Sequence, residues 1–379
     1  IPIDVVVDLM RYQNIRAANF RAFSADGNSI YVSTGFGDVD SLHLVEMPGG
    51  ARNQITFYRE PVSGVTRRPE SEQLFFLRDV GGSEFAQIFE MEPASGKERM
   101  LTDGESRNSS VVWDRRGGRI AYQSTRRNGA SNDIWLMDPA QPSRAELVLE
   151  SPDGTWWGPA EFSASGRKLL LANYVSITDS RVHALDLDSG KRSLIAGGPD
   201  QRSANLPVAF DDESGGIWFI TDEGSEFKQL AWLAPDPDAR PVIVTADIPW
   251  DVTNAAMSHD RSRMVFATNE DGMSRVYLMN TKSREYRRVD TIPTGLAFGF
   301  AFSADDRRLG MTLNLPHTPS DAFVLELGEG PLEYGALTRW TSSEIGGLDT
   351  SLFRTPELVR YPTFDRTEDR PRQLPAWVY

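Results

Sequence analysis

The sequence predicts an all-β fold, a seven-bladed β-propeller with four antiparallel strands in each blade. Two observations predict it: a turn signature that occurs seven times, and a fixed order of short apolar strands around each copy. Successive copies start 43, 47, 49, 48, 47 and 45 residues apart. Repeats of roughly 40 to 50 residues with four short strands each are typical of propeller blades. The copies occupy residues 23–27, 66–70, 113–117, 162–166, 210–214, 257–261 and 302–306.

The third repeat shows the strand pattern of one blade. Its apolar runs alternate with polar residues at a period of two, and Gly, Asp and Pro separate the runs. We expect strands at residues 110–113, 119–124, 133–138 and 145–149. The Asp, Ser and Gly residues of the recurring signature are interpreted as turn formers, because tight hairpins need positive φ or a side chain that caps the turn.

Length and strand pattern divide the chain into three parts. A single ring accounts for most of the 379 residues. We expect a short N-terminal segment at residues 1–16, the propeller at 17–340, and a tail at 341–379. The tail contains two strands around a charged turn, and the second strand ends on Trp377, Val378 and Tyr379. An unpaired apolar strand edge invites association, so the chain is expected to stop in the middle of a structure.

Composition excludes several classes of function. The net charge of −14 argues against nucleic acid as a partner, because phosphates would be repelled. No run of 18 apolar residues is present, so no membrane span is expected. The chain has no cysteine, which rules out disulfides and thiolate metal sites. This composition fits either the cytoplasm, which we slightly favour, or the periplasm, and it leaves a homo-oligomer open.

The two faces of the predicted ring differ. Turns between strands one and two, and between three and four, lie on one face and are short; we call this the short-turn face. The opposite face, the loop face, carries the connections between strands two and three and between blades, and both termini are expected there. Function concentrates on variable loops held by a rigid scaffold. The longer charged connections on the loop face are residues 78–85, 125–132, 174–181, 221–227, 269–274, 58–61, 156–159 and 248–251.

Several of these segments resemble the prolyl oligopeptidase family of serine peptidases, in the branch related to acylaminoacyl peptidases. The resemblance extends over essentially the whole chain. The repeats alone are shared with TolB-like propellers, whereas the segment that begins at residue 357 matches the one that leads into the family's hydrolase domain. The segments that carry the resemblance are residues 60–64, 78–85, 124–129, 221–227, 269–275 and 357–365.

The resemblance implies an α/β-hydrolase domain that this chain lacks. Members of the family carry a G-x-S-x-G elbow whose serine is activated by a histidine and an acid. No G-x-S-x-G occurs in the sequence, and the four histidines have no triad context. A hydrolase domain requires roughly 200 to 250 further residues. We therefore assign no catalytic residue and no cofactor, and expect no peptide hydrolysis by this mechanism from the chain alone.

In relatives, the resemblance implies, the propeller covers the active site, restricts access to short peptides and contributes side chains to substrate binding. Arginines on the loop face would pair with a substrate carboxylate or acyl oxygen, since guanidinium offers a planar fork of donors. Glutamates would hold a peptide amino terminus, and tryptophans would form an apolar rim at the domain interface. The alternative is that the charges are solvated or bridge to the missing domain, and that the tryptophans pack between blades. The candidates are Arg78, Arg126, Arg127, Glu84, Glu226, Glu270, Trp156, Trp157 and Trp250.

No metal site is predicted. The four histidines do not repeat at a blade position that would direct them to the axis, and the Asp-x-Asp segments fall in hairpin turns.

Three hypotheses follow from the sequence. The first is a non-catalytic propeller that gates a serine oligopeptidase or acylaminoacyl-peptidase-like hydrolase, with that hydrolase domain and short peptides as partners. The second is a free-standing TolB-like scaffold for a protein partner, and the third is a metal-dependent propeller lyase.

Overall fold

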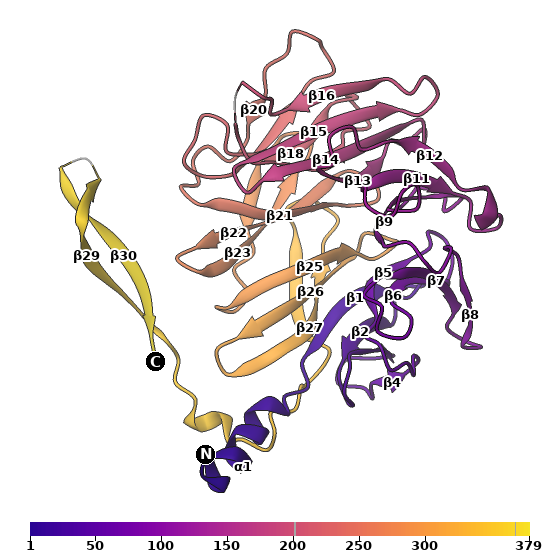
Figure 1. Cartoon of the computed structure of the whole chain (residues 1–379). Coiled ribbons are helices and arrows are strands. Elements are labelled where there is room, and N and C mark those ends of the chain that lie inside the picture. The colour runs from indigo at the N-terminus through magenta and orange to yellow at the C-terminus, as the bar shows by residue number, and fades with distance from the viewer. Residues whose placement is uncertain (201, 368) are drawn as a thin grey trace.

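The chain folds as the predicted seven-bladed propeller (Figure 1). This computed structural model describes residues 1–200, 202–367 and 369–379. Within these residues, seven four-stranded antiparallel sheets each use four consecutive strands, and a separate two-stranded sheet follows them. Helix α1 (Ile3–Gln13) precedes the ring and was not anticipated. Two 3-10 turns, η1 (Pro142–Arg144) and η2 (Thr350–Leu352), complete the elements.

The first four blades contain strands β1 to β16. Their bounds are β1 (Ala18–Phe23), β2 (Ile30–Thr34), β3 (Ser41–Val45), β4 (Asn53–Gln54), β5 (Ser63–Arg67), β6 (Leu74–Arg78), β7 (Gln87–Glu92), β8 (Lys97–Met100), β9 (Asn108–Trp113), β10 (Ile120–Ser124), β11 (Asp133–Met137), β12 (Glu146–Leu149), β13 (Trp156–Phe162), β14 (Lys168–Ser176), β15 (Asp179–Asp186) and β16 (Arg192–Ala196). The four strands of the third blade lie within two residues of their predicted positions.

The last three blades and the tail contain strands β17 to β30. Their bounds are β17 (Asn205–Phe210), β18 (Ile217–Thr221), β19 (Gln229–Leu233), β20 (Val242–Ile243), β21 (Asp251–Met257), β22 (Arg263–Glu270), β23 (Met273–Asn280), β24 (Tyr286–Arg288), β25 (Leu296–Phe302), β26 (Arg308–Leu315), β27 (Thr318–Leu327), β28 (Tyr334–Arg339), β29 (Glu357–Thr367) and β30 (Arg370–Val378).

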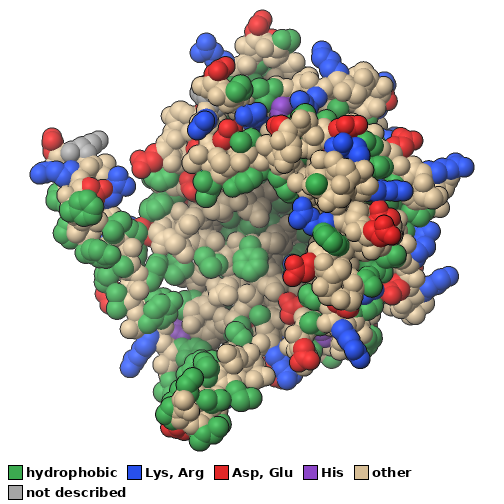
Figure 2. Space-filling view, viewed as in Figure 1, with side chains coloured by type: hydrophobic (Ala, Val, Ile, Leu, Met, Phe, Trp, Pro, Cys, Tyr) green, Lys and Arg blue, Asp and Glu red, His purple; other side chains and the backbone are tan. Residues whose placement is uncertain are grey.

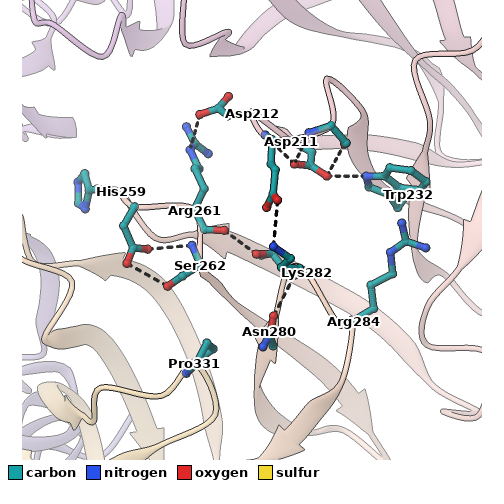
Figure 3. A pocket seen from close by; sticks show the side chains of 14 residues that line it. Asp211, Asp212, Trp232, His259, Arg261, Ser262, Asn280, Lys282, Arg284 and Pro331 are labelled. Carbon is teal, nitrogen blue, oxygen red and sulfur yellow. Dashed lines mark hydrogen bonds and ion pairs between the residues drawn. The ribbon is translucent and has the colours of Figure 1, made fainter.

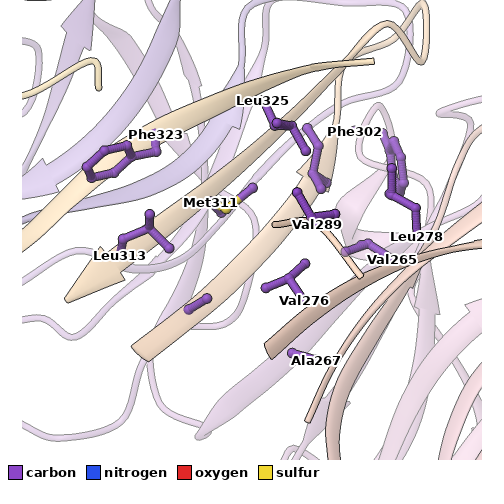
Figure 4. Close-up of a cluster of buried hydrophobic side chains, with 12 residues drawn as sticks. Val265, Ala267, Val276, Leu278, Val289, Phe302, Met311, Leu313, Phe323 and Leu325 are labelled. Atoms are coloured by element: carbon purple, nitrogen blue, oxygen red, sulfur yellow. The ribbon is translucent and has the colours of Figure 1, made fainter. Parts of the chain in front are cut away.

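Each blade buries both faces of its sheet against its two neighbours. Successive side chains of a strand point to opposite faces, so Phe75 contacts the third blade while Phe76 contacts the first. The buried residues form clusters at the blade interfaces, and the one between the sixth and seventh blades contains Val265, Leu278 and Met311 (Figure 4). Propeller stability thus rests on seven small cores, one at each interface.

The first strand of each blade lies next to the axis. The first strands of neighbouring blades contact one another all the way round, from β1 through β25 and back to β1. In every blade the pairing of the first strand with the second is interrupted by a register shift, as between Phe20 and Ala22 or between Pro159 and Glu161. A bulge increases local twist and redirects a side chain. The recurring bulge therefore bends each innermost strand around the channel.

Hydrogen bonds between neighbouring blades give the recurring turn signature a second role on the short-turn face. Arg67 Nε donates to the Phe23 carbonyl at 3.0 Å, and Arg68 Nε donates to the Gly117 carbonyl at 2.8 Å. Arg119 likewise donates to the Gly166 carbonyl of the next blade. The turns thus shape their own hairpins and also present carbonyl acceptors to the adjacent blade.

The seam between the first and last blades closes through side chains. Phe20 packs with Val324 and Trp340, and the Phe20 N–H donates to Thr312 Oγ1 at 2.9 Å. Outside the seam, the two ends of the ring are also joined: Ile15 pairs with Ile345, and the Arg16 N–H donates to the Glu344 carbonyl at 2.9 Å. Both ends of the ring leave it side by side (Figure 1).

The tail forms the two strands expected around a charged turn. Strand β30 is paired on one side, with β29, and Leu358 lies opposite Trp377. The hairpin stands beside the ring (Figure 1) and contacts a loop-face turn, where Trp377 Nε1 donates to the Asp271 carbonyl at 2.7 Å. Most of its residues are exposed, and Phe364 is fully so. The outer edges of this hairpin have no partner strand within the described residues.

Two predicted loops are in fact tight turns between long strands. Residues 174–181 and 269–274 were expected to be extended loops, but β14 and β15 leave only residues 177 and 178 between them. Strands β22 and β23 are separated only by Asp271 and Gly272, both at positive φ. An Asp-Gly pair at positive φ favours a two-residue hairpin turn, which allows the ladder to continue to the tip. These hairpins therefore project from the loop face as rigid strands.

We expect Gly310→Ala to destabilise the propeller at the seam by about 1–3 kcal/mol, as overpacking of a tight core does. A Cβ on Gly310 would lie 2.1 Å from the ring of Phe20, which is 2 % exposed and has little room to move. Urea unfolding measures the loss, and Gly335→Ala is the control because its nearest neighbour would be 3.6 Å away. Equal stability of both variants would contradict tight packing at the seam. Adding Phe20→Leu to Gly310→Ala should cost less than the sum of the single changes.

Candidate functional site on the loop face

All nine candidate residues lie at the ends of strands or in connections that open on the loop face. They comprise Arg78 at the end of β6, Glu84 after β6, Arg126 and Arg127 after β10, Trp156 and Trp157 at the start of β13, Glu226 after β18, Trp250 just before β21, and Glu270 at the end of β22. They are distributed over five blades, so a ligand that contacted several of them would have to span the mouth of the channel.

The three candidate arginines are held by partners within the propeller. The Arg78 guanidinium lies 4.1 Å from the ring centre of Tyr58 and 4.3 Å from that of Phe89, with Glu60 3.6 Å away. Stacking between two rings orients the head group and leaves little of it exposed. Arg78 is therefore a fixed part of the wall of the loop face.

The other two arginines differ in how firmly they are held. Arg127 makes a bidentate pair with the buried carboxylate of Asp133 through contacts of 2.7 and 3.1 Å. Arg126 lies over the ring of Trp135 and 3.8 Å from Asp103. A bidentate pair is geometrically specific and leaves Arg127 little freedom to bind a ligand. Of the three arginines, Arg126 is the most exposed and the least constrained.

The candidate glutamates separate into one that is fully bonded and two that are not. Glu270 accepts from Thr268 Oγ1 at 2.9 Å and from the Tyr277 hydroxyl at 2.8 Å. Burial, together with this carboxylate, raises the pKa of Tyr277 to about 12. Glu84 and Glu226 are exposed, and neither carboxylate pairs with another side chain in the described parts of the chain. Glu84 also has a φ of 62°, which a non-glycine residue seldom adopts.

The three tryptophans occupy different environments. Trp157 is buried in the core between the third and fourth blades, and Trp250 is half-buried between the fifth and sixth. Both therefore contribute to blade packing. Trp156 remains exposed and lies beside Gly158, where a Cβ would come within 2.3 Å of its ring. Trp156 is the tryptophan that is accessible to a ligand or a second domain.

Exposed apolar side chains on the loop face were missed from the sequence. Figure 2 shows hydrophobic side chains beside the hollow at the middle of the ring. The β14–β15 turn contains the clearest example, since Ile177 is 82 % exposed at a hairpin tip. Turns normally carry Gly, Asn, Asp, Pro or Ser, so an apolar tip was the available signal. The set comprises Phe57, Val80, Phe85, Tyr174, Val175, Ile177, Leu206, Leu296 and Phe298.

The opposite, short-turn face carries a cleft of about 780 Å³ between the fifth and sixth blades. Trp232 Nε1 donates to Asp211 at 3.0 Å, and the Arg284 guanidinium stacks 3.9 Å from the centre of the Trp232 ring (Figure 3). Lys282 pairs with Glu213 at 3.1 Å. These charged groups therefore interact with one another inside the cleft.

A smaller cleft of about 480 Å³, lined by Phe36 and others, opens on the loop face.

Among the described residues, no three His, Asp or Glu side chains come together in a group that could hold a metal ion. His43 and His183 lie in the third strands of the first and fourth blades, and both are buried. No helix in the described parts of the chain is both long and apolar enough to cross a membrane.

Comparison with solved structures shows which proteins share this architecture. The chain aligns over 99 % of its length with a prolyl endopeptidase studied for the role of interdomain dynamics in catalysis and specificity, at a TM-score of 0.76 and 12 % identity. It also aligns with prolyl oligopeptidase B from Galerina marginata over 98 % of its length, at a TM-score of 0.74 and 12 % identity. The chain spans 56 % of each of these structures. The propeller fold expected from the resemblance is confirmed.

Sequence comparison gives a second relative. Tricorn protease homolog 1 from Streptomyces coelicolor is 28 % identical over 207 residues, which are 50 % of this chain and 18 % of that protein. The chain matches no protein-family model. The solved structures and this sequence relative are peptidases by name, and the chain covers only part of each.

We expect the protein to lose stability as the pH falls from about 6.5 toward 4, with part of the loss due to His183. Burial, together with Arg192 and Arg181, lowers the pKa of His183 from 6.5 to about 4. The unfolded chain therefore binds a proton in this window that the folded chain does not, which removes up to about 3 kcal/mol of unfolding free energy by pH 4.

Urea unfolding at about pH 7.5 and pH 4.5 measures this effect, and His183→Gln should reduce the difference between the two by about 2 kcal/mol. His317→Gln, whose imidazole bonds the neutral Thr355 hydroxyl, controls for loss of an imidazole. An unchanged pH dependence in His183→Gln would show that this residue does not contribute.

Proposed function

We propose that the chain is the non-catalytic propeller of a serine oligopeptidase or acylaminoacyl-peptidase-like hydrolase. Its role is to cover an α/β-hydrolase domain, to limit access and to help select short peptides. The observation that carries the proposal is the coverage: nearly the whole chain corresponds to 56 % of prolyl oligopeptidase structures. The remaining part of such a protein supplies the catalytic residues that this sequence lacks.

The two ends of the chain support a second domain. Helix α1 buries none of its residues, although Ile3, Val7 and Leu9 are apolar. An isolated helix of this length is marginal in water, so it needs a surface to pack against. The β29–β30 hairpin likewise exposes Tyr361 and Phe364. The exposed apolar side chains of both elements support a second domain that covers them.

The loop face supports a role in peptide selection. The carboxylates of Glu84 and Glu226 have no partner among the described residues, which suits them to hold the amino terminus of a peptide. Arg126 is the arginine best placed to pair with a substrate carboxylate or acyl oxygen, while Arg78 and Arg127 orient their neighbours. The exposed ring of Trp156 offers an apolar contact to a side chain or to the second domain.

The first test is to express the undisturbed reading frame that contains this chain and to treat the product with a fluorophosphonate. We expect a labelled species of roughly 65–70 kDa, which is one hydrolase-sized domain more than the present chain. Intact mass spectrometry identifies the product, and a sample that was not treated with the fluorophosphonate is its control. An unlabelled product close to 42.3 kDa would overturn the peptidase proposal and favour the free-standing TolB-like scaffold.

A second test concerns peptide selection in the whole protein. Replacing both exposed carboxylates, with Glu84→Gln and Glu226→Gln, should raise KM for short peptides with a free amino terminus by about 3- to 10-fold, as loss of a partly solvated charge pair does. The kcat should stay the same, because neither residue contacts reacting atoms, and acetylated peptides should be unaffected. Glu213→Gln on the short-turn face is the matched control. Equal effects on free and acetylated peptides would refute the assignment.

A further inference from the structure

Four charged side chains from four different blades meet on the short-turn face. Each follows or ends a first strand: Arg115 in the third blade, Glu161 in the fourth, Asp212 in the fifth and Arg261 in the sixth. Arg261 Nη2 lies 2.5 Å from Glu161 Oε1, and Arg115 makes a bidentate contact with Asp212. Each carboxylate also lies within 4.0 Å of the second arginine. We call these four residues the axial network.

The pairs in the axial network join blades that are not neighbours. Arg115 and Asp212 come from the third and fifth blades, and Glu161 and Arg261 come from the fourth and sixth. The first strands of all seven blades surround the axis in order. Side chains from blades two steps apart can therefore meet only by reaching across the mouth of the channel.

The axial network is electrically balanced and largely shielded from water. Its four side chains are between 16 % and 25 % exposed, and two positive charges face two negative ones. Glu161 also accepts from the Phe210 N–H at 2.6 Å, which fixes its carboxylate in position. Burial and the neighbouring Arg261 lower the pKa of Arg115 to about 10, so the carboxylates are needed to hold the two cations together.

We propose that the axial network closes the channel at the short-turn face, so that the channel is a blind chamber open only at the loop face. A peptide would then reach the covered site between the two domains and not through the ring, a consequence that rests on the proposed function. The closure itself is a property of this chain alone. The loop-face mouth, with the exposed Trp156, Leu206 and Phe298, would be the surface that a peptide meets first.

A reach-limited labelling experiment tests the closure. The chain has no cysteine, so Ala160→Cys introduces a single thiol next to Glu161. Ala160 is half-buried in β13, the innermost strand of the fourth blade, where it packs beside the core between the fourth and fifth blades. At about 3.3 Å per residue, the introduced thiol lies about 7 Å from the short-turn end of β13 and about 13 Å from its loop end.

The reagent is a maleimide attached to a bulky dextran by either a short arm of about 10 Å or an arm about three times longer. Because the thiol lies about 13 Å from the loop end of β13, at about 3.3 Å per residue, only the longer arm reaches it from the loop-face mouth. With the axial network intact, we expect the short arm to label the introduced thiol at least about tenfold more slowly than the long arm, because thiol reactions depend on access. In the chain that also carries Arg115→Ala and Arg261→Ala, the short arm should label as fast as the long arm. Ser189→Cys, in an exposed turn, should react equally with both arms.

Two further variants keep the experiment decisive. Arg167→Ala breaks an exposed ion pair with Asp188 on the same face and should leave the short-arm rate unchanged. If the double arginine variant does not fold, Glu161→Gln with Asp212→Asn weakens the axial network while it preserves side-chain shape. Rapid short-arm labelling of the intact network would overturn the proposal, as would slow labelling after the network is removed. Neither outcome depends on a hydrolase domain, so failure here is distinct from failure of the fluorophosphonate test.

Discussion

Closure of the ring is the constraint on which the rest of the structure depends. A blade of four strands has two apolar faces and cannot cover either one alone, so each must be packed against a neighbour. The seam is the critical interface because, within the described residues, the first blade and the last blade share no strand. Phe20 fills the space left by Gly310, and the pairing of Ile15 with Ile345 joins the two ends of the ring outside the core.

Closure also separates the tasks of the two faces. The short-turn face is used for bonding between blades, because its turns are uniform and their carbonyls accept from arginines of adjacent blades. The axial network extends this bonding across the channel. The loop face is free to vary, and it carries the chain ends, the projecting hairpins, and the carboxylates of Glu84 and Glu226, which pair with no other described side chain. This division explains why the proposed cover and the proposed peptide contacts both belong to the loop face.

The candidate site was predicted less completely than the fold. Residue type identified the charged and aromatic residues of the loop face, but it could not distinguish Glu226, which has no partner among the described residues, from Glu270, which accepts two hydrogen bonds. Nor could it separate the exposed Trp156 from the buried Trp157 beside it, since adjacent residues of a strand point to opposite faces. These distinctions depend on which blade face each side chain meets, and that is settled only when the ring closes.

The sequence by itself determined the number of blades, the order of strands and the face on which the termini emerge, because repeat spacing and period-two patterning are local properties. It also determined that the catalytic elbow of the resembling peptidases is missing from this chain. Only the tertiary structure determined where the recurring bulges lie, that Phe20 packs against the last blade, and that Arg115 pairs with Asp212. These contacts join residues that are far apart in the chain, and no local pattern records which of them become neighbours.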